Sequence, residues 1–408
     1  MNYQEIYDKC VKWKQTHLLA YYDELDDTAK QALLAQIEET DFSVLNSIGN
    51  KETAAHKEKI TPLAAMELSE IEECAERFMQ IGVDALRQGK VGAVLLAGGM
   101  GTRLGSDAPK GVYDIGLTRP VYIFQRLIEN LMDVVKLVGT WIPLYVMTSD
   151  KNHEATVSFL KEHAYFGYDA DSIFFFKQEM APASDYEGKI FLEKKNKLST
   201  SPNGNGGWFV SLDRAGLLDH IHTHGVAYLN VFAVDNVLQR IADPKFIGAV
   251  IEKDVAVGAK VVRKNAPDEK VGVMCLADGK PSIVEYYELT DELMNTKDAN
   301  GNPAYNFGVI LNYLFRVADL ERMMSKKLPL HIVEKKIPYI DADGREVRPE
   351  QPNGYKYEQL VLDMIHELGT CLPYEVVRSY EFAPIKNATG VDSVESARLL
   401  CKQNGIEL

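Results

Sequence analysis

Long apolar runs are missing from this sequence. No stretch of twenty consecutive apolar residues occurs in the 408-residue chain, so no transmembrane helix and no membrane partner are expected. The first ten residues, MNYQEIYDKC, lack the basic and then apolar pattern of a secretory signal peptide. Five cysteines occur without any C-x-x-C pair, which argues against a disulfide framework or a structural zinc site. Together these absences predict a cytoplasmic protein with reduced thiols.

Basic charge is also in short supply. The chain has 45 lysines and arginines against 59 acidic residues, a formal net charge of −14. A protein that binds nucleic acid through its phosphates needs a basic face, so no nucleic-acid partner is expected. A small polyanionic substrate is compatible with this balance, because a few local cations can neutralise it.

The pattern of apolar and polar residues predicts three parts: a helical region over residues 1–88, an α/β domain over 89–390 and a short C-terminal helix or tail over 391–408. Apolar residues recur at helical spacing through much of the first part. A polar stretch over residues 49–61 is expected to be a loop.

One helix within the first part has recognisable ends. Ser69-Glu70-Ile71-Glu72 has the form of a capping box that would open the helix, and Gly89 would close it.

Short apolar runs dominate the middle of the chain. They occur at Val91–Ala97, Leu144–Met147, Ile173–Phe176, Val226–Val234 and Val255–Val262. Helical stretches such as residues 122–138 separate several of them. This alternation predicts a Rossmann-like α/β fold, with a mixed and mostly parallel sheet flanked by helices. Two further runs on either side of Asp278-Gly279 predict an antiparallel hairpin attached to that sheet.

A glycine-rich loop follows the first of these runs. Gly98–Gly105, GGMGTRLG, would let backbone N–H groups approach phosphate oxygens or a base edge without clashes from Cβ atoms. The spacing excludes the dinucleotide fingerprint, because the sixth position from Gly99 is Leu104, and the Gly-Lys-Ser/Thr of a P-loop is missing. Taken alone, the loop could equally be a structural turn.

Two cations accompany the loop. Arg103 lies inside it, and Lys110 follows in Pro-Lys-Gly. A guanidinium group and a flexible ammonium group beside a glycine loop suit a triphosphate.

The run from Leu96 to Gly116, LAGGMGTRLGSDAPKGVYDIG, resembles the signature of the UDP-sugar pyrophosphorylases, above all those that make UDP-N-acetylglucosamine. Further motifs match in the family's order: Phe176–Pro182, Pro202–Gly207, Val234–Asn236, Val284–Tyr286, Lys336–Tyr339, Pro352–Lys356 and Phe382–Ala388. The resemblance implies a nucleotidyltransferase domain over residues 89–390. Its activity would join UTP to a sugar 1-phosphate, with N-acetylglucosamine 1-phosphate as the expected sugar, and release pyrophosphate.

The resemblance also implies the site residues. Catalytic positions would be Arg103, Lys110 and Lys386. Contacts to UTP, the sugar or the phosphates would come from Leu96, Ala97, Gly98, Gly99, Gln178, Gly204, Asn205, Asp235, Glu285, Tyr286, Asn306 and Lys356. The expected cofactor is Mg²⁺, held by Asp235.

Physical chemistry gives several of these residues two interpretations. Asp235 ends an apolar run, where its carboxylate could hold Mg²⁺ or cap a following helix. Gln178 could read the uracil edge, since an amide both donates and accepts, or be an exposed polar residue. Glu285 could accept hydrogen bonds from sugar hydroxyls or simply be solvated, and isolated lysines such as Lys356 and Lys386 are typical of protein surfaces.

The reaction itself needs little acid–base catalysis. The attacking oxygen of a sugar 1-phosphate is already anionic, so the main requirements are alignment and neutralisation of two polyanions. Arg103, Lys110, Lys386 and a metal ion on Asp235 would meet them.

Three departures from the family pattern bear on the substrate. Met100 stands where eukaryotic members carry glutamine, and Asn306–Val309, NFGV, replaces their Asn-Ala-Gly-Asn. The chain ends at Leu408, where eukaryotic members continue into a further domain, so a short form is expected. Alternatives are a UDP-glucose or UDP-N-acetylgalactosamine pyrophosphorylase, or a non-catalytic UDP-sugar sensor.

Overall fold

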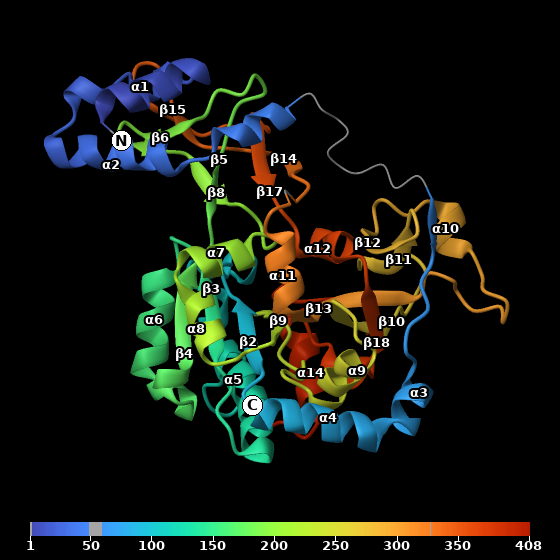
Figure 1. The fold of residues 1–408 in the computed structure, drawn as a ribbon. Coiled ribbons are helices and arrows are strands. Elements are labelled where there is room, and N and C mark those ends of the chain that lie inside the picture. The colour runs from blue at the N-terminus through green and yellow to red at the C-terminus, as the bar shows by residue number, and fades with distance from the viewer. Residues whose placement is uncertain (1, 49–58, 327) are drawn as a thin grey trace. The chain divides into compact units, whose positions relative to one another are not determined.

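The chain forms two compact units, and each is assembled from segments that are far apart in the sequence (Figure 1). The computed structural model describes residues 2–48, 59–326 and 328–408. The first unit comprises Met1–His56, Glu179–Gly207 and Leu328–Val361, and the second comprises Lys57–Gln178, Trp208–Lys327 and Leu362–Leu408. These two units are defined by the contacts within the chain. They do not test the domain boundaries predicted after residues 88 and 390, which stay a prediction.

Helices from the N-terminus and short strands from later segments build the first unit. The helices are α1 (Tyr3–Lys12) and α2 (Asp27–Glu39). The antiparallel strand pairs are β5 (Met180–Pro182) with β8 (Thr200–Pro202), β6 (Leu192–Lys194) with β7 (Lys197–Leu198), β14 (His331–Lys335) with β17 (Gly354–Glu358), and β15 (Tyr339–Ile340) with β16 (Glu346–Val347). The buried Gln15 joins the two kinds of element, because its amide donates to the Gly188 carbonyl at 2.8 Å and accepts from the Ile190 N–H at 2.9 Å.

A ten-stranded mixed sheet forms the centre of the second unit. Its strands are β1 (Ile60–Pro62), β2 (Val91–Leu96), β3 (Leu144–Thr148), β4 (Ile173–Lys177), β9 (Tyr228–Ala233), β10 (Val257–Arg263), β11 (Val273–Ala277), β12 (Lys280–Val284), β13 (Phe307–Arg316) and β18 (Cys371–Glu375). Strands β9, β2, β3 and β4 run parallel, which places their carboxyl ends at one edge. The long strand β13 is antiparallel to β9, β10 and β11, and joins this parallel block to the rest of the sheet.

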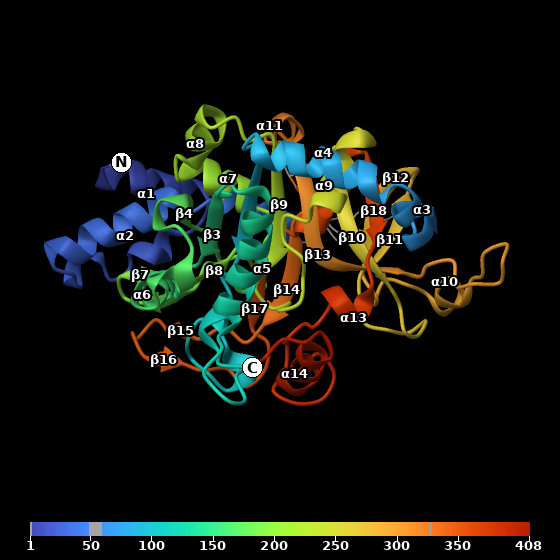
Figure 2. The same ribbon diagram turned by 90° about the horizontal axis from the view of Figure 1, so that it is seen from below.

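Helices cover both faces of the parallel block (Figure 2). Helices α5 (Ile123–Val138) and α6 (His153–Glu162), which connect β2, β3 and β4, lie on one face, and α7 (Trp208–Arg214) and α8 (Leu217–Thr223) lie on the other. The remaining helices of the unit are α3 (Leu68–Glu73), α4 (Ala75–Arg87), α9 (Pro244–Glu252), α10 (Asp291–Asn295), α11 (Val317–Met323), α12 (Val361–Leu368), α13 (Arg378–Glu381) and α14 (Val394–Gln403). The predicted α/β fold is therefore confirmed.

Helices α4 and α9 pack with their backbones in contact, and two glycines make this possible. A Cβ atom on Gly82 would lie 1.9 Å from the Pro244 carbonyl oxygen, and one on Gly248 would lie 1.9 Å from that of Phe78. Any side chain at either position would push the helices apart.

Two local expectations are wrong. The single helix predicted between Ser69 and Gly89 is two helices, α3 and α4, which meet at Cys74. The first of them starts at Leu68, with Glu67 as its N-cap and no hydrogen bond from the Glu67 side chain. A distant side chain overrides the local signal, because Glu375 at the end of β18 accepts the Leu68 N–H at 3.0 Å. Of the loop predicted over residues 49–61, residues 49–58 lie outside the described part, and residues 60–62 form strand β1 against β11.

Other local expectations are confirmed. Helix α4 ends just before Gly89, whose φ of +69° gives the left-handed turn typical of a helix end. The Asp278-Gly279 pair, both with positive φ, forms the two-residue turn between antiparallel strands β11 and β12. Among the described residues, no helix combines the length and apolar character needed to span a bilayer.

Candidate functional site

The glycine-rich loop leaves the carboxyl end of β2, at the edge where the parallel strands end. Its first residues are fixed by backbone and amide groups: the Ala97 N–H donates to the Met147 carbonyl at 2.8 Å, and the buried Asn152 amide donates to the carbonyls of Ala97 at 2.8 Å and Gly99 at 3.2 Å. With these carbonyls engaged by the protein, the loop has a defined shape before any ligand binds.

The Gln178 side chain packs against Gly98 of this loop. The Gln178 side chain, only 7% exposed, lies so close to Gly98 that a Cβ atom there would be 2.1 Å from its Oε1 atom. The Gln178 N–H donates to the Thr148 carbonyl at 2.7 Å, which holds the residue at the end of β4. The buried amide excludes the interpretation of Gln178 as an exposed polar residue and places a donor and an acceptor beside the loop.

The residues after the glycine-rich loop fold back, so that Lys110 lies beside the first residues of the loop. The Lys110 N–H donates to the Gly99 carbonyl at 3.2 Å, and Met100 forms a backbone bridge with Pro109. Gly111 packs against the Phe124 ring of α5, so closely that a Cβ atom would lie 2.3 Å from the ring. The buried helix thus anchors the residue next to Lys110.

Lys110 forms an ion pair with Asp235 across the strand ends. Its Nζ atom lies 3.6 Å from Asp235 Oδ2, and both side chains are mostly buried. Burial lowers the pKa of Lys110, the Asp235 carboxylate opposes that shift, and the positive charges of Arg103 and Lys386 add to it. Lys110 therefore pairs with Asp235 and lies within electrostatic reach of the other two predicted catalytic cations.

Lys386 reaches this cluster on a segment that runs along the residues after β9. The Ile385 N–H donates to the Asp235 carbonyl at 2.9 Å, and Asn236 forms an antiparallel bridge with Pro384. The Lys386 ammonium group is half-buried and pairs with Asp392 at 3.0 Å. Lys386 is thus a positioned cation and not the isolated surface lysine that it could have been.

The remaining predicted residues of the second unit lie around strands β11, β12 and β13. Glu285 and the exposed Tyr286 follow β12, and the Glu285 N–H donates to Glu288 Oε2 at 2.7 Å. The Asn306 carbonyl accepts the Lys264 N–H at 2.9 Å, and the Phe307 ring lies under the Arg263 guanidinium group, 5.1 Å from its carbon to the ring centre.

Three predicted residues belong to the first unit. Gly204 has a φ of +86°, and a Cβ atom on it would lie 2.2 Å from the Gln359 carbonyl oxygen. Asn205 Oδ1 accepts the Val361 N–H at 3.0 Å, so this turn bonds the start of α12. Lys356 lies half-buried on β17.

The alternative role for Asp235 is wrong. The residues after it form turns, and the next helix, α9, begins at Pro244 with Asp243 as its N-cap. The Asp235 carboxylate is left for the ion pair with Lys110.

Sequence reasoning missed the amides that hold the site together. Asn152 fixes the glycine loop and Asn236 bonds the Lys386 segment, and both are buried. Asn236 ends the Val234–Asn236 motif, but the motif assigns it no role of its own. Asn152 lies in the connection after β3, and residues in such connections gather at the ligand-binding edge of an α/β sheet.

Chemically, the second unit offers fixed backbone groups, a buried amide and three cations, together with the carboxylates of Asp235 at Lys110 and Asp392 at Lys386. No group of three or more histidine, cysteine, aspartate or glutamate side chains suited to a metal occurs in the described residues. A single carboxylate suits an ion that takes its other ligands from substrate phosphates and water, as Mg²⁺ does.

Comparison with known proteins agrees with this arrangement. The family model described as UTP–glucose-1-phosphate uridylyltransferase matches residues 40–407. The UDP-N-acetylglucosamine pyrophosphorylase of Saccharomyces cerevisiae is 38% identical over 373 residues, which cover 88% of this chain and 77% of that protein.

Two solved structures are similar to different degrees. The uridine diphosphate N-acetylglucosamine pyrophosphorylase of Trypanosoma brucei, in complex with an inhibitor, aligns with a TM-score of 0.82 and 28% identity, over 97% of this chain and 84% of that one. A UDP-glucose phosphorylase of the same organism aligns with a TM-score of 0.69 at 18% identity, over 93% and 78% of the two chains, and shares the fold.

Proposed function

Since the chain belongs to the UTP–glucose-1-phosphate uridylyltransferase family, we infer that it transfers the uridylyl group of UTP to a sugar 1-phosphate. A phosphate oxygen of the sugar attacks the α-phosphorus of UTP, the bond to the β-phosphate breaks, and pyrophosphate leaves with that electron pair. No proton has to move. The observation that carries this proposal is the cluster of Lys110, Asp235 and Lys386 beside a preformed glycine loop.

The cations supply the chemistry that the reaction needs. Arg103, Lys110 and Lys386 would neutralise the two approaching polyanions and stabilise the charge that builds up in the transition state. We propose that Asp235 holds Mg²⁺ together with the UTP phosphates. The bound ion would neutralise phosphate charge, while Lys110 would exchange its carboxylate partner for a phosphate.

We also propose that Gly98 and Gln178 read the uracil base. The Gln178 amide lies at Gly98 and can pair with a base edge that offers one donor and one acceptor. A mismatched base would leave buried polar groups unpaired, at about 1–3 kcal/mol each. Pyrophosphate release with UTP, ATP, CTP and GTP tests the proposal: UTP should be strongly preferred, and equal kcat/KM with ATP would refute it.

A substitution at Gly98 probes the base site. Gly98→Ala would place a methyl group where Gln178 Oε1 now lies, so the amide has to move. We expect kcat/KM for UTP to fall by about 10–200-fold, the range typical of one misplaced methyl group. The double variant Gly98→Ala with Gln178→Ala is the control, because truncation of Gln178 removes the atom that the new methyl group would meet. If the clash with Gln178 is the cause, the double variant should lose no more activity than Gln178→Ala alone, and a larger loss would show that the effect is not specific to Gln178.

We propose N-acetylglucosamine 1-phosphate as the sugar substrate. The 38% identity to the Saccharomyces cerevisiae protein supports this choice over glucose 1-phosphate, since the UDP-glucose relative shares only the fold. The Phe307 ring is stacked with Arg263, which limits how far it can crowd an N-acetyl group.

The sugar preference is tested by kcat/KM for the 1-phosphates of glucose, galactose, N-acetylglucosamine and N-acetylgalactosamine with UTP saturating. We expect N-acetylglucosamine 1-phosphate to be used best, with a margin of about 10–200-fold over glucose 1-phosphate if volume alone discriminates. Better use of glucose 1-phosphate would overturn the sugar assignment and leave uridylyl transfer intact. In that case, a gain on the N-acetyl sugar in Phe307→Ala would identify Phe307 as the cause.

A cytoplasmic location completes the proposal. All five cysteines are free thiols, which suits a reducing compartment. The expected partners are the two small substrates, and the acidic balance of the chain does not suit nucleic acid.

A further inference from the structure

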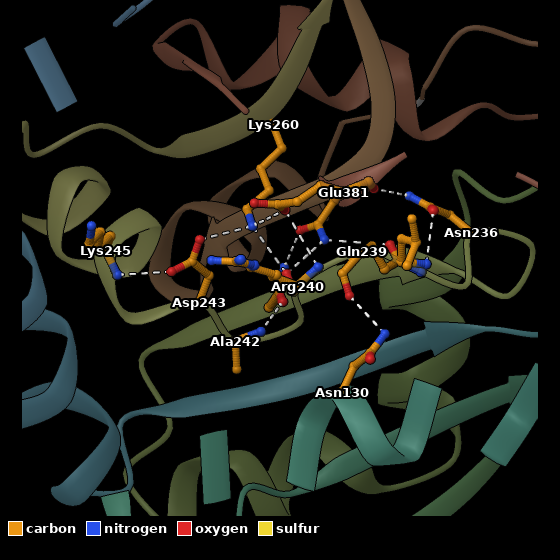
Figure 3. A network of polar contacts seen from close by, with 12 residues as sticks. Asn130, Asn236, Gln239, Arg240, Ala242, Asp243, Lys245, Lys260 and Glu381 are labelled. Atoms are coloured by element: carbon orange, nitrogen blue, oxygen red, sulfur yellow. Dashed lines mark hydrogen bonds and ion pairs between the residues drawn. The ribbon is translucent and has the colours of Figure 1, made fainter. Parts of the chain in front are cut away.

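A fully buried lysine, Lys260, lies in a network of polar contacts (Figure 3). Lys260 on β10 is 0% exposed, and its Nζ atom donates to Glu381 Oε2 at 2.6 Å, Asp243 Oδ2 at 3.0 Å and the Arg240 carbonyl at 3.1 Å. An ammonium group has three hydrogens, so these acceptors use all of them. The acceptors belong to three different places: the loop after β9, the start of α9 and the end of α13.

From Glu381 the network continues to the residue next to Asp235. The buried Asn236 amide donates to the Glu381 backbone carbonyl at 2.7 Å and accepts the Ala383 N–H at 2.9 Å. The Ile385 N–H then donates to the Asp235 carbonyl. Residues 381–385 are therefore bonded along residues 235–236, and Lys386 follows directly.

The loop after β9, which carries Asp235 and Asn236, is also held by hydrogen bonds on its other side. Gln239 donates to the Ala233 carbonyl at 2.7 Å, and Asn130 on α5 donates to the carbonyls of Val237 and Gln239, each at 3.1 Å. Figure 3 shows Asn130 reaching from α5 to Gln239 in the loop after β9. The loop that carries Asp235 is thus a rigid partner for the segment that carries Lys386.

Stability alone is a poor reason for such a network. Burial of one ammonium group and two carboxylates is costly, and well-packed apolar residues often serve stability as well or better. Helix α13 has only four residues, too few to hold its own position through helical bonds. Its last residue is the one that Lys260 anchors.

We propose that Lys260, Glu381 and Asn236 are positioning residues for uridylyl transfer, which hold the Lys386 segment in register with Asp235. The inference rests on the proposed function, because it matters only if Lys386 stabilises the transition state. A displacement of about 1 Å at a reacting group can cost roughly 10²-fold in rate. Loss of the Lys260–Glu381 contact should therefore lower kcat. It should not affect the binding of the uracil base, which is proposed to involve Gly98 and Gln178.

The test variant is Glu381→Leu. It leaves Lys260 paired with Asp243, so no net charge is left buried. We expect kcat to fall at least about tenfold while KM for UTP changes less than about threefold, as expected for a loss confined to the transition state. Glu381→Gln keeps the shape and an acceptor for Lys260, and should recover most of the lost kcat.

Glu375→Leu is the matched control. Glu375 is also buried and accepts a hydrogen bond at 2.7 Å from Arg263, a cation on the same strand as Lys260, but its Oε2 atom accepts the Leu68 N–H at the start of α3. We expect Glu375→Leu to lower the melting temperature and leave kcat within about twofold of the original, since it does not touch the Lys386 segment.

A double-mutant cycle with Lys386→Met separates positioning from general damage. If Glu381 acts through Lys386, Glu381→Leu should cost less than about twofold in the Lys386→Met background. An undiminished cost there, or full kcat in a folded Glu381→Leu single variant, overturns the inference. Should Glu381→Leu not fold by circular dichroism, Glu381→Gln takes its place in the cycle. Failure of the unaltered protein to release pyrophosphate would instead refute the proposed function.

Discussion

Asp235→Asn is expected to lower kcat by at least about 10²-fold, a loss typical for removal of one key electrostatic group from an active site. The side chain keeps its shape but no longer offers Mg²⁺ a charged oxygen. The fold should survive, because the contact of Asp235 with the Lys386 segment runs through its backbone carbonyl. The apparent affinity for Mg²⁺ should fall as well, since the change removes a charged ligand of the ion.

A second ion pair at the same edge of the sheet provides the control. Asp150 follows β3 and pairs with Lys177 of β4 at 3.3 Å, but both side chains are about half exposed. Asp150→Asn should leave kcat within about twofold, as expected for an exposed pair. Steady-state pyrophosphate release over a magnesium titration measures both variants. Near-normal turnover of Asp235→Asn would remove Asp235 from the metal site.

Lys110→Met should have an effect of similar size, with kcat lower by about 10²–10³-fold. Its ammonium group is mostly buried and lies 3.6 Å from Asp235, so no solvated cation can replace it. Lys110→Arg should restore only part of the activity, because a planar guanidinium group does not fit a site shaped for an ammonium group.

The kinetic pattern decides what Lys110 does. A loss in kcat with a small change in KM would show that Lys110 acts in the transition state, whereas a rise in KM alone would show uniform substrate binding and contradict the proposed role. Lys177→Met, which removes the cation of the exposed control pair, should behave like the unaltered protein in the same assay.

The parallel half of the fold could be predicted because its signals are local. Strands β2, β3 and β4 appear as short apolar runs, and helices with apolar stripes lie between them. The glycine loop and Asp235 could be placed for the same reason, since each directly follows such a strand. Local pattern therefore located the ligand-binding edge of the sheet.

Features that depend on distant contacts could not be predicted. Strand β13 is an almost continuous apolar run, but nothing within it indicates that it runs antiparallel between β9 and β10. The start of α3 depends on Glu375, some three hundred residues later. Likewise, the first unit forms because residues 179–207 and 328–361 pack with the N-terminal helices.

In the candidate site, the sequence identified the charged residues and not their supports. Lys110 and Lys386 lie in motifs, whereas Phe124 and Lys260, which help to hold their segments, look like ordinary core positions in the sequence. The burial of a lysine on a strand can be recognised only when the structure shows that both faces of that strand are covered.

The most direct test is to mix the protein with UTP, N-acetylglucosamine 1-phosphate and Mg²⁺ and to quantify both products. We predict UDP-N-acetylglucosamine and pyrophosphate in equal amounts, with both lost on chelation of the metal and both reduced together in Asp235→Asn. If the protein binds UDP-sugar but releases no pyrophosphate with any of the four sugar 1-phosphates, the proposed uridylyl transfer is wrong and the protein is a non-catalytic sensor.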